Sequence, residues 1–103
     1  MKIPNRRVRF DYLLEPDRYE AGVSLTGGEA KAIRTGHADI SQSVARIVDG
    51  QAYLINANIP VSGATKYDSK RTRKLLLHRD EIVSIGTKMK QRKLTLVPLK
   101  VYT

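Results

Sequence analysis

Apolar and polar residues alternate most clearly in two short runs on either side of Asp49-Gly50. Residues 43–48 (SVARIV) and 51–56 (QAYLIN) are rich in β-branched and other apolar side chains, which favour extended structure. Asp-Gly between two such runs favours a tight two-residue turn. The pattern therefore predicts a β-hairpin over residues 43–56.

A helix is predicted to begin just after Leu25. The Thr26 side chain can cap the Glu29 amide, and the Glu29 carboxylate can bond back to the Thr26 amide, which is the capping-box arrangement. Residues 30–34 continue the helical pattern, and Gly36 stands where helices commonly end in the left-handed conformation.

A second and longer helix is predicted over residues 71–85 (RTRKLLLHRDEIVSI), where several aliphatic side chains gather on one side at helical spacing. Gly86 is expected to end this helix. Residues 88–93 (KMKQRK) are then expected to form a basic connector.

The remaining segments are predicted to be extended or irregular. They are a basic N-terminal arm (1–9), a strand or short helix (10–14), an extended segment (19–25), a loop (57–67) and a final strand (94–103). The order of strands, helix, hairpin, helix and strand predicts a mainly β domain with two packed helices. A small antiparallel barrel of the OB type is the natural candidate.

The length of 103 residues fits one domain covering residues 1–103. The final strand still alternates where the sequence stops, whereas a closed barrel needs a further strand. We therefore expect the chain to lack the last strand of the barrel. The sequence has no cysteine, no apolar run of membrane-spanning length and no secretory signal. A cytoplasmic protein is expected.

Positive charge is concentrated in the second part of the chain. The net charge is +9, and residues 66–103 carry eleven basic and three acidic side chains, whereas residues 1–65 carry eight and seven. Such an excess favours polyanionic partners, and its uneven distribution indicates one dedicated binding surface.

Residue types that carry catalysis or metal binding are sparse. The two histidines, His37 and His78, are far apart in the sequence, and the glycines complete no phosphate-binding fingerprint. The adjacent carboxylates of Asp80 and Glu81 would point in different directions on a helix, which favours a surface position over a catalytic pair. We therefore expect neither an enzyme nor a cofactor nor a metal site.

Several basic residues are candidates for RNA contacts. On the predicted second helix Arg71, Lys74 and His78 share one face, where cations neutralise phosphates; a solvated helix face is the equal alternative. Arg6 and Arg7 in the arm precede aromatic residues that can stack on unpaired bases; a frayed tail followed by two aromatic residues of the core is the equal alternative. For an acid such as Glu20, an ion pair with a nearby arginine is favoured over a base contact.

The chain also resembles a known family. The segment RTRKLLLH (71–78), the segment YEAG (19–22), the helix segment LTGGEAKAIRTG (25–36) and the closing LTLVPLKVY (94–102) are similar, in the same order, to segments of the SsrA-binding protein (SmpB) family. The similarity extends from Asn5 to Tyr102. This ordered set is specific, although each motif alone is modest.

The resemblance implies an OB-like barrel surrounded by helices and a binding protein that is not an enzyme. The implied partners are the tRNA-like domain of tmRNA (SsrA RNA), which such proteins deliver to stalled ribosomes in trans-translation, and the ribosome. A monomer without small-molecule substrate or membrane partner is expected. The candidate RNA-binding residues are Asn5, Arg6, Arg7, Glu20, Gly22, Lys31, Arg34, Arg71, Arg73, Lys74, Leu76, Leu77 and His78.

The resemblance raises Glu20 from an ion pair to an RNA contact. It also implies a further strand and a long basic tail after a segment like LKVY, so this chain is expected to be a C-terminally incomplete member. The alternative function is that of a general OB-type single-stranded RNA-binding or ribosome-associated protein.

Overall fold

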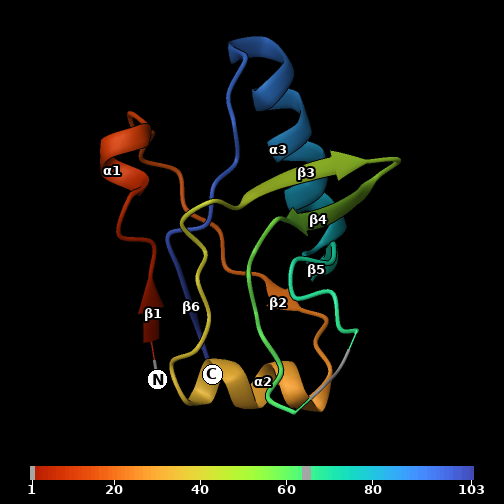
Figure 1. Ribbon diagram of the computed structural model, residues 1–103. Coiled ribbons are helices and arrows are strands. Elements are labelled where there is room, and N and C mark those ends of the chain that lie inside the picture. The colour runs from red at the N-terminus through yellow and green to blue at the C-terminus, as the bar shows by residue number, and fades with distance from the viewer. Residues whose placement is uncertain (1, 64–65) are drawn as a thin grey trace.

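The computed structural model describes residues 2–63 and 66–103 of the chain (Figure 1). Within these ranges the chain forms a mixed α/β structure of six strands and three helices. In chain order the elements are β1 (Lys2–Pro4), α1 (Val8–Asp11), β2 (Gly22–Val23), α2 (Gly27–Arg34), β3 (Val44–Val48), β4 (Gln51–Ile55), β5 (Arg73–Leu76), α3 (Arg79–Arg92) and β6 (Lys100–Tyr102).

The strands form two antiparallel sheets. The larger one has the order β2-β5-β4-β3, and the smaller one pairs β1 with β6. A single backbone bridge between Ala45 and Leu96 connects the edge strand β3 to the segment that leads into β6. Antiparallel pairing is confirmed. An OB-like barrel lacking its last strand and two helices were expected, whereas the described residues form two separate sheets and three helices.

The predicted hairpin is confirmed as β3 and β4. Asp49 and Gly50 form the turn with positive φ angles of 50° and 74°, which matches the mirror-image turns that fit the twist of paired strands. The ladder runs from Val48 opposite Gln51 to Val44 opposite Ile55.

Alternation along the strands separates two faces of the larger sheet. Ala45, Ala52 and Leu54 are buried on the inner face, and Val101 of β6 packs against the core that includes Leu54. The inner face also meets Met89 of α3, which lines a cavity together with β3. The outer face carries polar and exposed side chains and is described below.

The predicted helix after Leu25 is also confirmed, as α2. Both bonds of the capping box are present between Thr26 and Glu29, at 2.9 and 3.2 Å. Gly36 has a positive φ of 79°, as expected for the residue that ends the helix. In Figure 1 the helix lies across the bottom of the molecule, beside β1 and β6, and Ile33 joins a core cluster with Ile59.

One prediction for the N-terminal part is wrong, and another is decided between its two alternatives. Residues 2–4 of the expected arm form β1, because Ile3 pairs with Val101. For residues 10–14 the sequence left a strand or a short helix open, and the short helix α1 occupies residues 8–11. Phe10 and Leu13 are almost fully exposed, at 87% and 101%, so the apolar character of this segment is not used to cover the described core.

The largest difference concerns residues 71–85. Residues 73–76 form the strand β5, and a helix begins only at Arg79, where the Glu81 carboxylate accepts a hydrogen bond from the His78 amide at 3.1 Å. Gly86 does not end this helix, which continues to Arg92 and absorbs the expected connector, because Lys, Met, Gln and Arg favour helices. The predicted loop at 57–67 contains no helix or strand in its described part; positions 64 and 65 lie outside the described residues.

A buried ionic network joins α2 to β5. Glu29 is fully buried and accepts bonds from the guanidinium groups of Arg73 (2.5 Å) and Arg71 (2.6 Å) and from the hydroxyl of Tyr67. The Arg73 side chain is also fully buried, and it donates further bonds to the carbonyl groups of Ala57 and Ser69, each at 2.9 Å. Among the described residues, every buried side-chain nitrogen and oxygen of this network has a hydrogen-bond partner, as the burial of a charge requires.

The same network fixes the charge of Glu29. Burial alone would raise the pKa of its carboxyl, but the bonds from Arg71, Tyr67, the Thr26 backbone and Arg73 lower the pKa from 4.5 to about 2. The unfolded chain therefore binds a proton more readily than the folded chain. The stabilisation is complete above about pH 4.5 and is lost as the pH falls towards 2.

We predict that Glu29→Gln lowers the free energy of unfolding by about 3 kcal/mol at pH 7, because two arginines lose their counter-charge. The stability of the parent protein should fall between pH 4.5 and pH 2, and that of the variant should fall less over this interval. Urea unfolding followed by circular dichroism measures both. Glu15→Gln, at an exposed position, is the control; equal pH profiles for the parent and Glu29→Gln would contradict the prediction.

Candidate nucleic-acid interface

The ladder between β2 and β5 brings two of the sequence motifs together. Gly22 lies opposite Leu76, and Val23 lies opposite Leu75. A Cβ atom placed on Gly22 would lie 3.3 Å from the Cβ of Leu76, so glycine permits the close approach of the two strands. The ladder ends two residues short of Glu20 on one strand and of His78 on the other.

Glu20 is exposed and is tied to the smaller sheet. The hydroxyl of Tyr102 donates a hydrogen bond to the Glu20 carboxylate, and this bond raises the pKa of Tyr102. Among the described residues Glu20 makes no salt bridge, so the ion pair favoured from the sequence is not formed. Its carboxylate is accessible to a partner.

The end of β5 combines exposed apolar and polar groups. Leu76 is 57% exposed, Leu77 is partly buried and His78 is exposed just before α3. An apolar side chain beside an imidazole ring offers contacts to base edges and ribose. With Glu20 and Gly22, these three residues form what we call the β2–β5 surface.

Within β5 the side chains alternate between the interior and the surface. Arg73 is fully buried, whereas Lys74 is exposed on the outer face. Arg71 lies at the boundary, with 34% of its side chain exposed and its guanidinium held by Glu29. The helical face proposed for Arg71, Lys74 and His78 therefore does not exist, because these residues lie in and beside a strand.

Two predicted RNA-binding residues serve the fold. Arg73 donates every bond described above to groups inside the protein. Asn5 is 7% exposed, and its side-chain amide donates to the carbonyl groups of Pro98 (2.9 Å) and Ile40 (3.3 Å). A buried side chain with bonded donors cannot reach an RNA bound to the surface, so the expected direct contacts of Arg73 and Asn5 do not fit the structure.

The remaining basic candidates are exposed but belong to other elements. Arg6 and Arg7 follow β1 and line a hollow of about 340 Å³, and Arg7 pairs with Asp11 at 3.6 Å. Lys31 and Arg34 lie on the exposed side of α2. The structure thus joins Glu20, Gly22 and the end of β5 in one surface, and leaves these four cations outside that ladder.

Sequence reasoning missed Arg46 and Tyr53, which lie on the outer face of the larger sheet. They pair directly across β3 and β4, and Tyr53 in turn pairs with Lys74. The period-two alternation of the predicted hairpin places Arg46 and Tyr53 at outward positions, and this signal was available without a structure.

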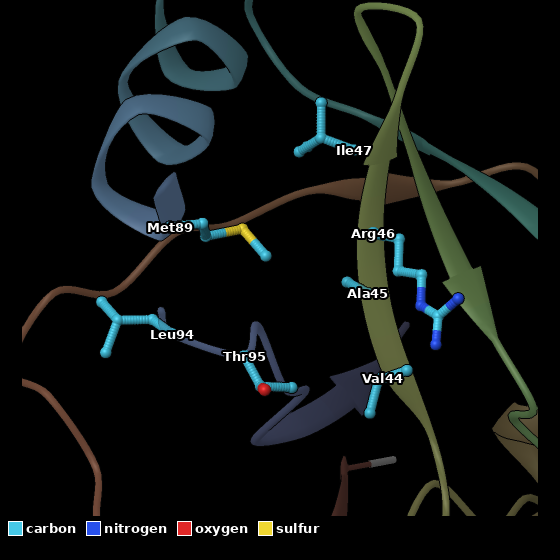
Figure 2. A pocket seen from close by; sticks show the side chains of 7 residues that line it. All are labelled: Val44, Ala45, Arg46, Ile47, Met89, Leu94 and Thr95. Carbon is cyan, nitrogen blue, oxygen red and sulfur yellow. The ribbon is translucent and has the colours of Figure 1, made fainter. Parts of the chain in front are cut away.

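A cavity of about 390 Å³ lies between β3 and the C-terminal end of α3. Figure 2 shows Ile47 directed towards Met89 across this space, whereas the side chain of Arg46 points to the opposite side of the strand. The lining residues are Val44, Ala45, Arg46, Ile47, Met89, Leu94 and Thr95. Among residues 2–63 and 66–103, no cluster of metal-ligating side chains occurs and no helix is long and apolar enough to cross a bilayer.

The family model described as "SmpB protein" matches residues 2–103. A protein named "SsrA-binding protein" from Rhodopseudomonas palustris (strain BisB18) is 46% identical over 101 residues, covering 95% of this chain and 64% of that protein. One of the same name from Gloeothece citriformis (strain PCC 7424) is 48% identical over 103 residues, covering 95% and 65%. This chain therefore spans slightly less than two thirds of the length of these relatives.

A solved structure also resembles the fold. It is described as "tmRNA-SmpB: a journey to the center of the bacterial ribosome", and its matching chain is 44% identical with a TM-score of 0.76. The match covers 98% of this chain and 72% of the solved chain.

The neighbours Arg73 and Lys74 allow a test of the two faces of β5. We predict that Arg73→Met lowers the free energy of unfolding by at least about 3 kcal/mol, because Glu29 loses a buried partner and several carbonyl groups lose their donor. Lys74→Met should change it by less than about 0.5 kcal/mol, as is usual for an exposed site. Urea unfolding measures both; similar losses for the two variants would show that Arg73 is not the buried anchor.

Proposed function

The chain belongs to the SmpB protein family, and on this premise we propose that it is an RNA-binding protein that binds the tRNA-like domain of tmRNA (SsrA RNA). We further propose that it supports the delivery of this RNA to stalled ribosomes in trans-translation. The names of its relatives support the RNA partner. The description of the solved neighbour, which mentions both tmRNA and the ribosome, supports both partners.

One observation about the structure supports this proposal most directly. The β2–β5 surface unites Glu20 and Gly22 with Leu76, Leu77 and His78, although the two groups are more than fifty positions apart in the chain. These residues offer a carboxylate acceptor, exposed backbone, an apolar contact and an imidazole within one area. Such a mixture suits the unstacked bases of a folded RNA better than it suits a phosphate backbone alone.

The exposed cations supply the other part of the binding free energy. Lys74 lies beside the β2–β5 surface, while Lys31 and Arg34 lie on α2 and Arg6 and Arg7 follow β1. Each cation that neutralises a phosphate releases counterions and makes binding sensitive to salt. In this proposal the cations position the RNA and Glu20 selects among bases. Arg71 remains bonded to Glu29, and the exposed part of its side chain faces the surface.

The proposal also includes the arrangement of the two sheets within the domain and the cellular compartment of the protein. The bridge between Ala45 and Leu96, together with the β1–β6 pair, supports an OB-type arrangement in which the two sheets form parts of one barrel-like domain over residues 1–103. The protein would act in the cytoplasm, where ribosomes work, as a monomer. Its role would be binding without catalysis, and the name of its relatives supports the binding part of this statement.

We predict tighter binding to a tRNA-like fragment of tmRNA than to an unrelated RNA hairpin of equal length, at both low and moderate salt. Lys74→Ala should weaken binding to both RNAs and reduce the slope of log K against log salt by about one, because one phosphate contact is lost. Fluorescence anisotropy with labelled RNA measures this. Equal affinities for the two RNAs would defeat the tmRNA proposal, and preference for an unstructured strand would favour a general OB-type single-strand binder.

We predict that Glu20→Ala reduces the preference for the tRNA-like fragment over the hairpin by about tenfold, since a good base contact contributes about 1–3 kcal/mol of discrimination. The salt slope should not become shallower, because no cation is removed. Glu15→Ala, another exposed acid of the same segment, is the matched control. An unchanged preference in Glu20→Ala would remove this residue from the interface.

A further inference from the structure

The outer face of the larger sheet carries three side chains in a row. No single segment that resembles the family contains all three. Arg46 on β3 lies directly opposite Tyr53 on β4, and Tyr53 lies directly opposite Lys74 on β5. Side chains that face each other in this way have Cβ atoms about 4.5–5.5 Å apart. Tyr53 is therefore the middle residue of the row, with Arg46 on the strand at one side and Lys74 on the strand at the other.

Both cations are available to a partner. Arg46 and Lys74 are exposed, and in the part of the chain that the structure describes neither forms a salt bridge. Figure 2 shows the Arg46 side chain directed away from the cavity that α3 helps to line. The row consequently lies on the side of the sheet opposite to the helix.

The strand positions around the row are mostly apolar, and the nearest carboxylate of the β2–β5 surface, Glu20, lies beyond the end of β2. Val48 and Leu76, also at outward positions, are 49% and 57% exposed. The outward positions of β2, β3, β4 and β5, all within the described ranges, carry no carboxylate. A face with a tyrosine between two unpaired cations, and no acid at its outward strand positions, is complementary to a polyanion that also presents flat bases.

We propose that Arg46, Tyr53 and Lys74 form a stacking platform for one unpaired base of the bound RNA. The base would stack on the ring of Tyr53, and the phosphates on its two sides would contact Arg46 and Lys74. Base stacking on aromatic side chains is sequence-tolerant and suits unpaired RNA. This proposal rests on the proposed function for its class of partner, and it extends the β2–β5 surface across the sheet, because Leu76 lies on the same face.

Substitutions of Tyr53 test the platform. Tyr53→Leu removes the ring and keeps an apolar side chain, so affinity for the tRNA-like fragment should fall about tenfold, in line with the loss of one stacked base. Tyr53→Phe keeps the ring and should bind within about twofold of the parent protein. Lys90→Ala, an exposed cation on α3, is the control for general charge. Thermal unfolding of each variant separates loss of affinity from loss of folding.

A spectroscopic readout makes the test independent of the natural RNA. The chain has no tryptophan, so Tyr53→Trp places a single indole on the platform. Its fluorescence should be quenched by a uridine heptamer and not by a heptamer of abasic sugar-phosphate units. Further substitution of Arg46 and Lys74 by alanine in this variant should weaken the quenching.

The outcomes separate this proposal from the proposed function. If the parent protein binds the tRNA-like fragment and Tyr53→Leu binds equally well, the platform is wrong and the proposed function stands. If the parent does not prefer that fragment, the proposed function fails, and the indole experiment still decides the platform. Equal quenching by the abasic heptamer, or none by either, would overturn it.

Discussion

The buried bonds between Glu29 and the two arginines are the interaction on which the rest of the structure depends. Glu29 begins α2 through its capping box, and its carboxylate receives Arg73 from β5 and Arg71 from the residues before it. One side chain therefore fixes the start of a helix and the orientation of a strand 44 residues away. Ion pairs of this kind lose their hydration on burial and contribute little net stability, but removing one partner leaves an uncompensated charge.

Elements specified by neighbouring residues could be predicted from the sequence. The hairpin follows from Asp49-Gly50 between two apolar runs, and α2 follows from Thr26 and Glu29, because these contacts span only a few positions. The segment 71–78 could not be assigned in this way. Its leucines and cations satisfy a helical period and also a period of two, and the choice is made by β2, β4 and Glu29, which are distant in sequence.

The candidate site also contains residues that could be predicted from the sequence and residues whose position depends on distant partners. The resemblance to a family identified Glu20, Gly22 and Leu76, and the ladder places the latter two opposite each other. The same resemblance placed Asn5 at the RNA surface, and Arg73 was expected there as one of the basic residues of the segment 71–78, yet both are buried with their donors bonded. Burial of a polar side chain depends on partners that composition does not reveal. Tyr53 was assigned to the hairpin correctly, and Arg46 opposite it follows from the same hairpin, but Lys74 joins them only when β5 pairs with β4.

Alternation along β5 links folding to recognition. Since successive side chains point to opposite faces, the anchoring of Arg73 inside the protein forces Lys74 and Leu76 outward. A slip of one residue would place Lys74 against Glu29 and turn Arg73 to the solvent, and every contact of the outer face would change with it. A lysine in that position could not donate the several directed bonds that the guanidinium supplies. The ionic network therefore acts chiefly as a register device: it makes one pairing of β5 far more favourable than its neighbours, and this pairing creates both the β2–β5 surface and the row around Tyr53.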